Sequence, residues 1–154
     1  MRNISFFMYF MSCMFAFAGN DIPSYKGRQS SDLFFKGKTE EQILDDCVNN
    51  QSTLVVNFCE KRKFEMASRK LKVLFSIQLK ATKKNDISLR GNGLPAASAY
   101  FISSQISWLK YRDDTCVFEY LYSGSGTIRG VEYFSCLLKM TNRRIEELSD
   151  ESSE

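Results

Sequence analysis

The chain has 154 residues, with 21 basic and 18 acidic side chains, 5 cysteines and no histidine. This length suits a single modest domain, and the near balance of charge, without a block of basic residues, argues against nucleic-acid binding. Because there is no histidine, Ser–His and Cys–His nucleophile systems are excluded.

The first 18 residues predict a cleavable signal peptide. Arg2 precedes the apolar run 4–17, and the segment ends in Ala16-Phe17-Ala18, which has small residues at two positions before the expected cleavage. A membrane anchor is the poorer interpretation because a span needs roughly 20 apolar residues. A lipoprotein acylated at Cys13 is the second alternative, but the apolar run continues past that cysteine. We therefore expect cleavage after Ala18 and export to the periplasm of a Gram-negative bacterium, with no membrane contact afterwards.

Polar segments flank the expected domain, which spans 39–148. Residues 19–38 are rich in Gly and Ser and are predicted to form a flexible arm. Its apolar cluster at 33–35 is expected to attach the arm to the domain. The acidic residues 149–154 are predicted to be a disordered tail.

The first half of the domain predicts a short helix followed by a long one. Thr39 and Gln42 have the spacing of a capping box, which predicts a helix over 40–47. Thr53 is then the candidate N-cap of a long helix. Its apolar stripe recurs at steps of three and four, at Phe64, Ala67, Leu71, Leu74, Phe75 and Gln78.

The stretch 83–94 contains Asn, Asp and two Gly residues and is predicted to be a turn-rich connection. Pro95 suits the first turn of the next helix, where its missing N–H has no cost, and that helix is expected to end near Tyr122. One face of it is predicted to consist of Phe101, Gln105, Trp108, Arg112 and Cys116.

A glycine-rich loop over 123–130 follows. It is not a phosphate-binding loop, because no strand precedes it and no Gly-Lys-Ser/Thr follows it. A final helix is expected from Val131. Its core positions follow heptad spacing, at Val131, Phe134, Leu138, Thr141, Ile145 and Leu148.

The cysteine pattern predicts disulfides. If Cys13 leaves with the signal peptide, four cysteines remain, and an even number in a small exported protein indicates two bridges. Zinc is the competing interpretation, but it usually requires cysteines in close pairs, and here no two are that near and no histidine is present.

The preferred connectivity follows from the expected helical hairpin. Cys116 and Cys136 lie equally far from Gly126, so antiparallel helices would place them side by side. That leaves Cys47 to pair with Cys59. The predicted fold is therefore all-α: a small antiparallel bundle of three main helices plus a short N-terminal helix, stapled by two disulfides.

Catalytic chemistry has little support in the sequence. The adjacent carboxylates 45–46 and 113–114 are the remaining candidates for a hydrolase, but neighbours on a helix do not face each other. We expect a protein that is not an enzyme and that needs no cofactor and no metal.

The second half carries a longer motif, Phe101-x2-Ser104-Gln105-x2-Trp108-x2-Tyr111-Arg112-Asp113-x2-Cys116, followed by the glycine-rich loop and Cys136-x4-Thr141-x2-Arg144-x3-Leu148. This motif resembles that of the LprI-type lysozyme-inhibitor-like family, which comprises small secreted or periplasmic helical proteins. The resemblance covers 45–148. The chain departs from the family at Ser68 and Lys72, where Asp and Asn are common.

The motif is interpreted as mainly structural. Trp108 is large enough to require a major packing role, and Arg112 and Asp113 can join helices by charge-assisted hydrogen bonds. Residues on the facing helix are expected to complete one network. Its predicted members are Gln105, Trp108, Tyr111, Arg112, Asp113, Thr141 and Arg144.

The resemblance implies a protein that binds and inhibits a lysozyme or another muramidase. The alternatives are an immunity protein that neutralises a toxin delivered to the periplasm, or an envelope-stress factor without an enzyme target. A cation presented to an acidic catalytic cleft would favour inhibition. The candidate partner-binding residues are Arg90 and Asn92 in the first connection and Arg129 in the glycine-rich loop; otherwise both loops are plain connections.

Overall fold

The computed structural model describes residues 30–124 and 126–150, so the predicted signal peptide, Cys13 and the start of the predicted arm lie outside the described residues. The described part is all-α and contains no strand, which confirms the predicted fold class. Its helices are α1 (Ser31–Phe34), α2 (Glu40–Asn49), α3 (Thr53–Gly91), α4 (Ala97–Tyr122) and α5 (Arg129–Asp150). No described helix is long and apolar enough to cross a membrane.

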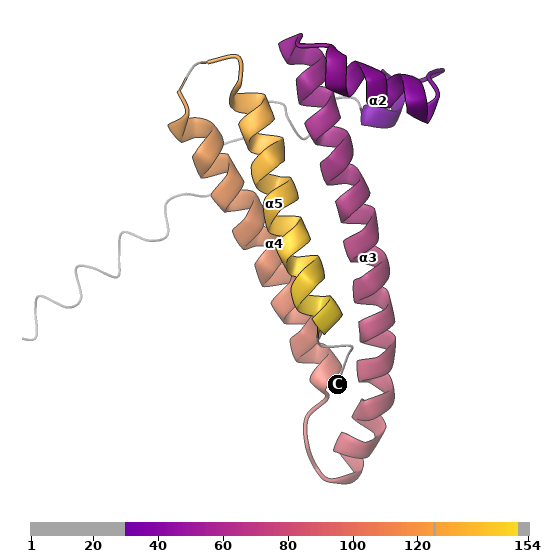
Figure 1. The fold of residues 1–154 in the computed structure, drawn as a ribbon. Coiled ribbons are helices and arrows are strands. Elements are labelled where there is room, and N and C mark those ends of the chain that lie inside the picture. The colour runs from indigo at the N-terminus through magenta and orange to yellow at the C-terminus, as the bar shows by residue number, and fades with distance from the viewer. Residues whose placement is uncertain (1–29, 125, 151–154) are drawn as a thin grey trace, which may run out of the picture.

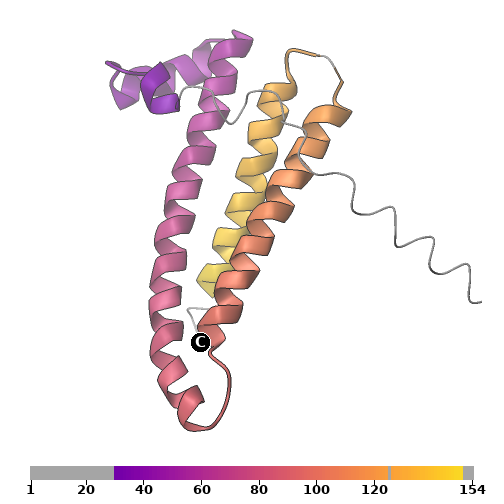
Figure 2. The same cartoon turned by 180° about the vertical axis from the view of Figure 1, so that it is seen from behind.

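Three long helices form the bundle. Helix α3 has 39 residues, which corresponds to roughly 58 Å at 1.5 Å per residue. Helix α4 returns antiparallel to it, and α5 lies alongside both (Figure 1). Seen from behind, α3 and α4 extend well past the end of α5 and close into a hairpin (Figure 2). The bundle is thus three helices thick at one end and two at the other.

The core lies where all three helices run together. Four of the six predicted heptad positions of α5 are buried: Phe134, Thr141, Ile145 and Leu148 are at most 6% exposed. The other two, Val131 and Leu138, are only partly buried. One apolar cluster joins α5 to Cys116 and Tyr120 of α4, and another joins it to α3. The amphipathic period of α5 therefore places this helix between the other two.

Both predicted disulfides are present. Cys47 pairs with Cys59, with 5.7 Å between their Cα atoms, and Cys116 pairs with Cys136 at 5.6 Å. The first bridge ties α2 to the beginning of α3, and the second ties α4 to α5 across the glycine-rich loop. The symmetry of the hairpin about Gly126 therefore led to the correct pairing.

The N-terminal helices pack onto the start of α3. The capping box at Thr39 and Gln42 is confirmed, with both reciprocal hydrogen bonds formed, and α2 runs two residues longer than expected. Phe34 stacks on Phe58 at 3.8 Å, and Phe35 is 2% exposed. The end of the expected flexible arm is therefore a packed helix, because its aromatic pair has an apolar surface to cover.

The predicted connection 83–94 is wrong for most of its length. Helix α3 continues to Gly91, and only 92–96 connect it to α4. The reason is a tertiary contact: Asp86 is 4% exposed and accepts a hydrogen bond from the backbone N–H of Ser98 at 3.3 Å. Hydrogen bonds from Ser98 hold the pKa of the Asp86 carboxyl below its usual value. Asp86 of α3 therefore provides a hydrogen-bond acceptor for the first turn of α4.

The ends of α3, α4 and α5 differ slightly from the predicted ones. Ser52, rather than Thr53, is the N-cap of α3. Pro95 lies just before Ala96, the N-cap of α4, and not in its first turn. At the C-terminus α5 continues to Asp150, and the Ser149 hydroxyl donates to the Ile145 carbonyl at 2.7 Å. Residues 149 and 150, which were predicted to belong to the tail, are therefore helical, and 151–154 lie outside the described residues.

Candidate functional site: a polar network, a basic hairpin and an apolar groove

Most residues of the sequence motif meet in one polar network between α4 and α5. Arg112 donates from Nε and Nη2 to Asp113 Oδ1, at 3.0 and 2.7 Å, and from Nη1 to Thr141 Oγ1 at 3.4 Å. Arg144 donates from Nε to Gln105 Oε1 at 3.2 Å. Arg112 is 8% exposed and Thr141 is fully buried. These bonds therefore give hydrogen-bond partners to polar groups that would otherwise be buried without one.

Trp108 is the apolar centre of this network. The guanidinium carbons of Arg112 and Arg144 lie 5.3 and 5.9 Å from the centroid of its ring, within the range of cation–π attraction. Its indole packs on the cluster that joins α3 to α5. Tyr111 does not take part: its side chain is 63% exposed, because it precedes Arg112 by one position and points about 100° away. Its inclusion in the network was wrong.

The acidic pairs of the sequence form local contacts. Asp113 is paired with Arg112, and Asp114 Oδ2 accepts from Lys110 Nζ at 2.6 Å. Asp46 pairs with Lys38. Within the described residues, no cluster of three or more His, Cys, Asp or Glu side chains could hold a metal ion.

The candidate partner-binding residues lie at opposite ends of the bundle. Arg90 is in the last turn of α3 and Asn92 follows it, whereas Arg129 begins α5 at the other end (Figure 1). Arg129 is held by its own loop: Nη1 donates to the Gly124 carbonyl at 3.1 Å, and the guanidinium lies 4.7 Å from the Tyr120 ring centroid. One cleft therefore cannot receive both ends.

At the other end, Arg90 is exposed and only its Nε is engaged, donating to the Asp86 carbonyl at 3.3 Å. The Asn92 side chain donates to the Ser88 carbonyl at 3.0 Å and closes the helix. Arg90 therefore presents its terminal nitrogens to solvent, while Asn92 mainly shapes the turn.

Charge is strongly segregated along the chain, a signal that the overall balance conceals. Residues 66–112 contain one acidic residue, Asp86, which is buried. The same stretch contains the basic residues Arg69, Lys70, Lys72, Lys80, Lys83, Lys84, Arg90, Lys110 and Arg112. We call residues 79–100 the hairpin tip; it carries four of these cations and projects past α5 (Figure 2). A windowed charge count would have found it.

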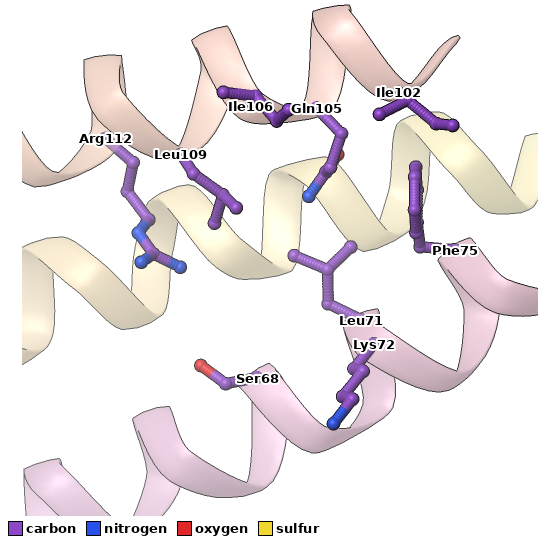
Figure 3. Close-up of a pocket in the computed structure, with 9 residues that line it drawn as sticks. All are labelled: Ser68, Leu71, Lys72, Phe75, Ile102, Gln105, Ile106, Leu109 and Arg112. Atoms are coloured by element: carbon purple, nitrogen blue, oxygen red, sulfur yellow. The ribbon is translucent and has the colours of Figure 1, made fainter. Parts of the chain in front are cut away.

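A groove of about 410 Å³ opens between α3 and α4, and we call it the α3–α4 groove. Its walls are apolar: Leu71 and Phe75 from α3, and Ile102, Ile106 and Leu109 from α4 (Figure 3). Its remaining lining residues are polar, namely Ser68, Lys72, Gln105 and Arg112. The network and the groove thus share Gln105 and Arg112.

The family described as Lysozyme inhibitor LprI matches residues 45–148, more than half of the chain. The chain belongs to this family. No curated protein and no solved structure shows significant similarity to it. The LprI match contains α3 and α4, both disulfides and the second half of α2, and it ends at Leu148, which is fully buried in α5.

The two departures from the LprI motif coincide in space. Ser68 and Lys72 stand where family members commonly have Asp and Asn, and both line the α3–α4 groove (Figure 3). As a result this chain has no acidic residue in the groove. The departures therefore change the charge of one surface and leave the buried network intact.

Ser68 is expected to lower the free energy of unfolding, and this effect can be measured. Its Oγ is buried and has no hydrogen-bond partner among the described residues. Because an unpaired buried hydroxyl destabilises a fold, Ser68→Ala is expected to raise the free energy of unfolding by about 1 kcal/mol. Urea denaturation measures this. Ser76→Ala is the matched control on the same helix, since Ser76 is exposed and bonded to the Val73 carbonyl. A loss of stability in Ser68→Ala would contradict the assignment.

Proposed function

We propose that this protein is exported and acts, without catalysis, as an inhibitor that binds a muramidase through the hairpin tip. Its membership of the LprI family carries the proposal. The shape and the charge of the α3–α4 hairpin support the choice of the tip over the glycine-rich loop.

The first feature is the shape of the tip. A narrow element of an inhibitor can enter a cleft that holds a polysaccharide chain. The hairpin tip is two helices wide and closes through the five residues 92–96. Gly93 has a φ of +73°, a backbone conformation that favours glycine and permits this short closure. The opposite end is broader, because α2 and α1 also pack there (Figure 1).

The second feature is the charge of the tip. Lys80, Lys83 and Lys84 form no ion pair with any described residue, and Arg90 leaves its terminal nitrogens exposed. A muramidase cleft contains two catalytic carboxylates. Opposite charges speed the encounter of two proteins and orient them, and they act mainly within the Debye length of about 10 Å. A basic tip therefore favours docking into such a cleft.

Charge reversal tests this arrangement. Arg90→Glu is expected to weaken inhibition of a susceptible muramidase about tenfold, because it places a carboxylate against the acidic cleft. The measurement is a cell-wall lysis assay with several muramidases, titrated with the purified protein. Arg143→Glu is the matched control: Arg143 is an exposed arginine of α5, outside the tip. Circular dichroism should remain helical in both variants.

Three outcomes would contradict the proposal at different levels. Normal inhibition by Arg90→Glu, together with weakened inhibition by Arg129→Glu, would move the binding surface to the glycine-rich loop. Equal weakening by Arg143→Glu would show that only net charge matters. If no muramidase is inhibited and a toxin is captured from culture supernatant, the immunity role replaces the inhibitor role.

A further inference from the structure

The α3–α4 groove is a site distinct from the hairpin tip. It lies in the middle of the bundle, between Ser68 and Phe75 of α3 and between Ile102 and Arg112 of α4 (Figure 3). Its walls leave large apolar side chains in water: Ile106 is 63% exposed, and Leu109 and Ile102 are 37% and 36% exposed. Apolar concavities of roughly 300–1,000 Å³ with a few converging polar groups are typical of ligand sites.

The amide nitrogen of a mostly buried glutamine points into this groove. Gln105 is 7% exposed, and its Oε1 accepts the bond from Arg144. That bond fixes which end of the amide is the nitrogen. The Nε2 group points toward Leu71 (Figure 3) and forms no hydrogen bond with any described residue. The unpaired Ser68 hydroxyl lies in the lining of the same groove. The groove therefore has one amide donor that faces it and one unpaired hydroxyl in its wall.

Arg112 lies at one end of the groove, and Lys72 lies nearer its middle (Figure 3). A guanidinium has five N–H donors, of which Arg112 uses two on Asp113 and one on Thr141. The guanidinium reaches from α4 toward α3 (Figure 3). Lys72 is exposed and has no ion pair with any described residue. From Ser68 to Phe75 the trough is about 10 Å long, polar at the Arg112 end and apolar at the Phe75 end.

These features select the chemistry of an occupant. The unengaged polar groups of the groove can all donate a hydrogen bond, and no lining residue is acidic. We propose that the α3–α4 groove binds a single-chain aliphatic carboxylate, of the medium-chain fatty-acid class, with its carboxylate near Ser68, Gln105 and Arg112 and its chain along Leu71, Ile106 and Phe75. A second copy of this face fits poorly, because a two-fold contact would set cations against cations.

The affinity of the groove for a carboxylate should depend on the length of the aliphatic chain. Each methylene buried on an apolar wall strengthens binding by up to about fourfold. Affinity therefore rises from hexanoate through octanoate to decanoate. It levels off once the chain is longer than the trough, because further methylenes remain in water. An aliphatic cation of the same length binds weakly, since Lys72 and Arg112 repel it.

The test is isothermal titration calorimetry with hexanoate, octanoate, decanoate and dodecanoate. The protein is purified from the cells that produce it, with whatever processing they carry out. Decyltrimethylammonium and decanol are the comparison ligands. All are used below their critical micelle concentrations. Saturable binding of one decanoate per chain is expected, with a tenfold or greater preference over decyltrimethylammonium.

Paired variants localise the site. Ile106→Ser and Lys72→Glu are each expected to weaken decanoate binding about tenfold. Both side chains are exposed, so the fold should tolerate these changes. The controls are Ile77→Ser and Lys70→Glu, which make the same changes at exposed positions of α3 outside the groove. Ser68→Asp sets a carboxylate beside Arg112 and is expected to abolish binding.

Several results would overturn the proposal. They are an absence of saturable binding, equal affinity for the cationic amphiphile, or equal effects of the groove variants and their controls. If decanoate does not bind but Ile106→Ser abolishes muramidase inhibition, the groove is a protein interface. If decanoate binds as expected while no muramidase is inhibited, the groove proposal stands and the inhibitor proposal fails.

Discussion

Replacing Cys116 and Cys136 together by serine is expected to lower the free energy of unfolding by about 3 kcal/mol. The bridge closes a loop with a sequence separation of 20 residues, and its loss returns the corresponding chain entropy to the unfolded state. Cys116 is also fully buried in the cluster with Tyr120 and Phe134. Since whole domains are stable by roughly 5–15 kcal/mol, this is a large fraction. Urea denaturation of the oxidised protein and the variant measures it.

The second bridge provides the comparison. Loss of Cys47–Cys59 is expected to release α2 from α3 while the three long helices remain folded, because α2 packs only at the beginning of α3. Limited proteolysis should then cut within 36–52. If the Cys116–Cys136 variant loses less than about 1 kcal/mol, packing alone holds the α4–α5 hairpin and the entropic argument fails.

Trp108→Ala is expected to destabilise the protein by about 3 kcal/mol, the lower end of the range for deleting a large aromatic side chain. The lower end applies because Trp108 is only partly buried. The substitution removes the ring that lies against the guanidinium groups of Arg112 and Arg144, and it opens the cluster between α3 and α5. Urea denaturation followed by helical circular dichroism gives the change.

Tyr111→Ala is the matched control, because Tyr111 is an aromatic residue of the same motif but is 63% exposed. Its expected effect is within about 0.5 kcal/mol. Trp108→Phe, which keeps a ring between the two arginines, should fall between these values. If Tyr111→Ala proves as harmful as Trp108→Ala, the side chain of Tyr111 is part of the stabilising network after all.

The sequence predicted those parts of the fold that depend on neighbours along the chain. The capping box at Thr39 needs only residues three apart, and the heptad stripe of α5 repeats within a single helix. The Cys116–Cys136 pairing required one further step, the symmetry of a hairpin about its turn. These signals are local, and tertiary contacts reinforce them.

The errors arose where a distant partner decides the conformation. Asn85 and Asp86 resemble a turn in isolation, but Ser98 supplies the hydrogen bonds that allow α3 to continue past them. The orientation of Tyr111 depends on which face of α4 meets α5. The groove joins residues of two helices across more than 25 positions of sequence, so no spacing within either helix reveals it.

The segregation of charge, unlike the groove, can be read directly from the sequence. A total of 21 basic and 18 acidic residues suggests an even mixture. Only the position of each charge shows that the acidic residues lie before 66 and after 112, with Asp86 as the exception. Net charge therefore describes solubility, whereas the order of the charges describes where a partner can dock.

The greater length of α3 and α4 relative to α5 has a consequence for motion. Between Gln78, which donates to the Leu148 carbonyl, and Phe101, the only buried residues are Asp86 and Ser98. Regions with few buried apolar contacts open locally at a small fraction of the global free energy. Backbone amides of 80–98 should therefore exchange with solvent long before those around Cys116. The hairpin can therefore change conformation while the three-helix part stays closed, and substitutions near its end should leave the rest of the molecule folded.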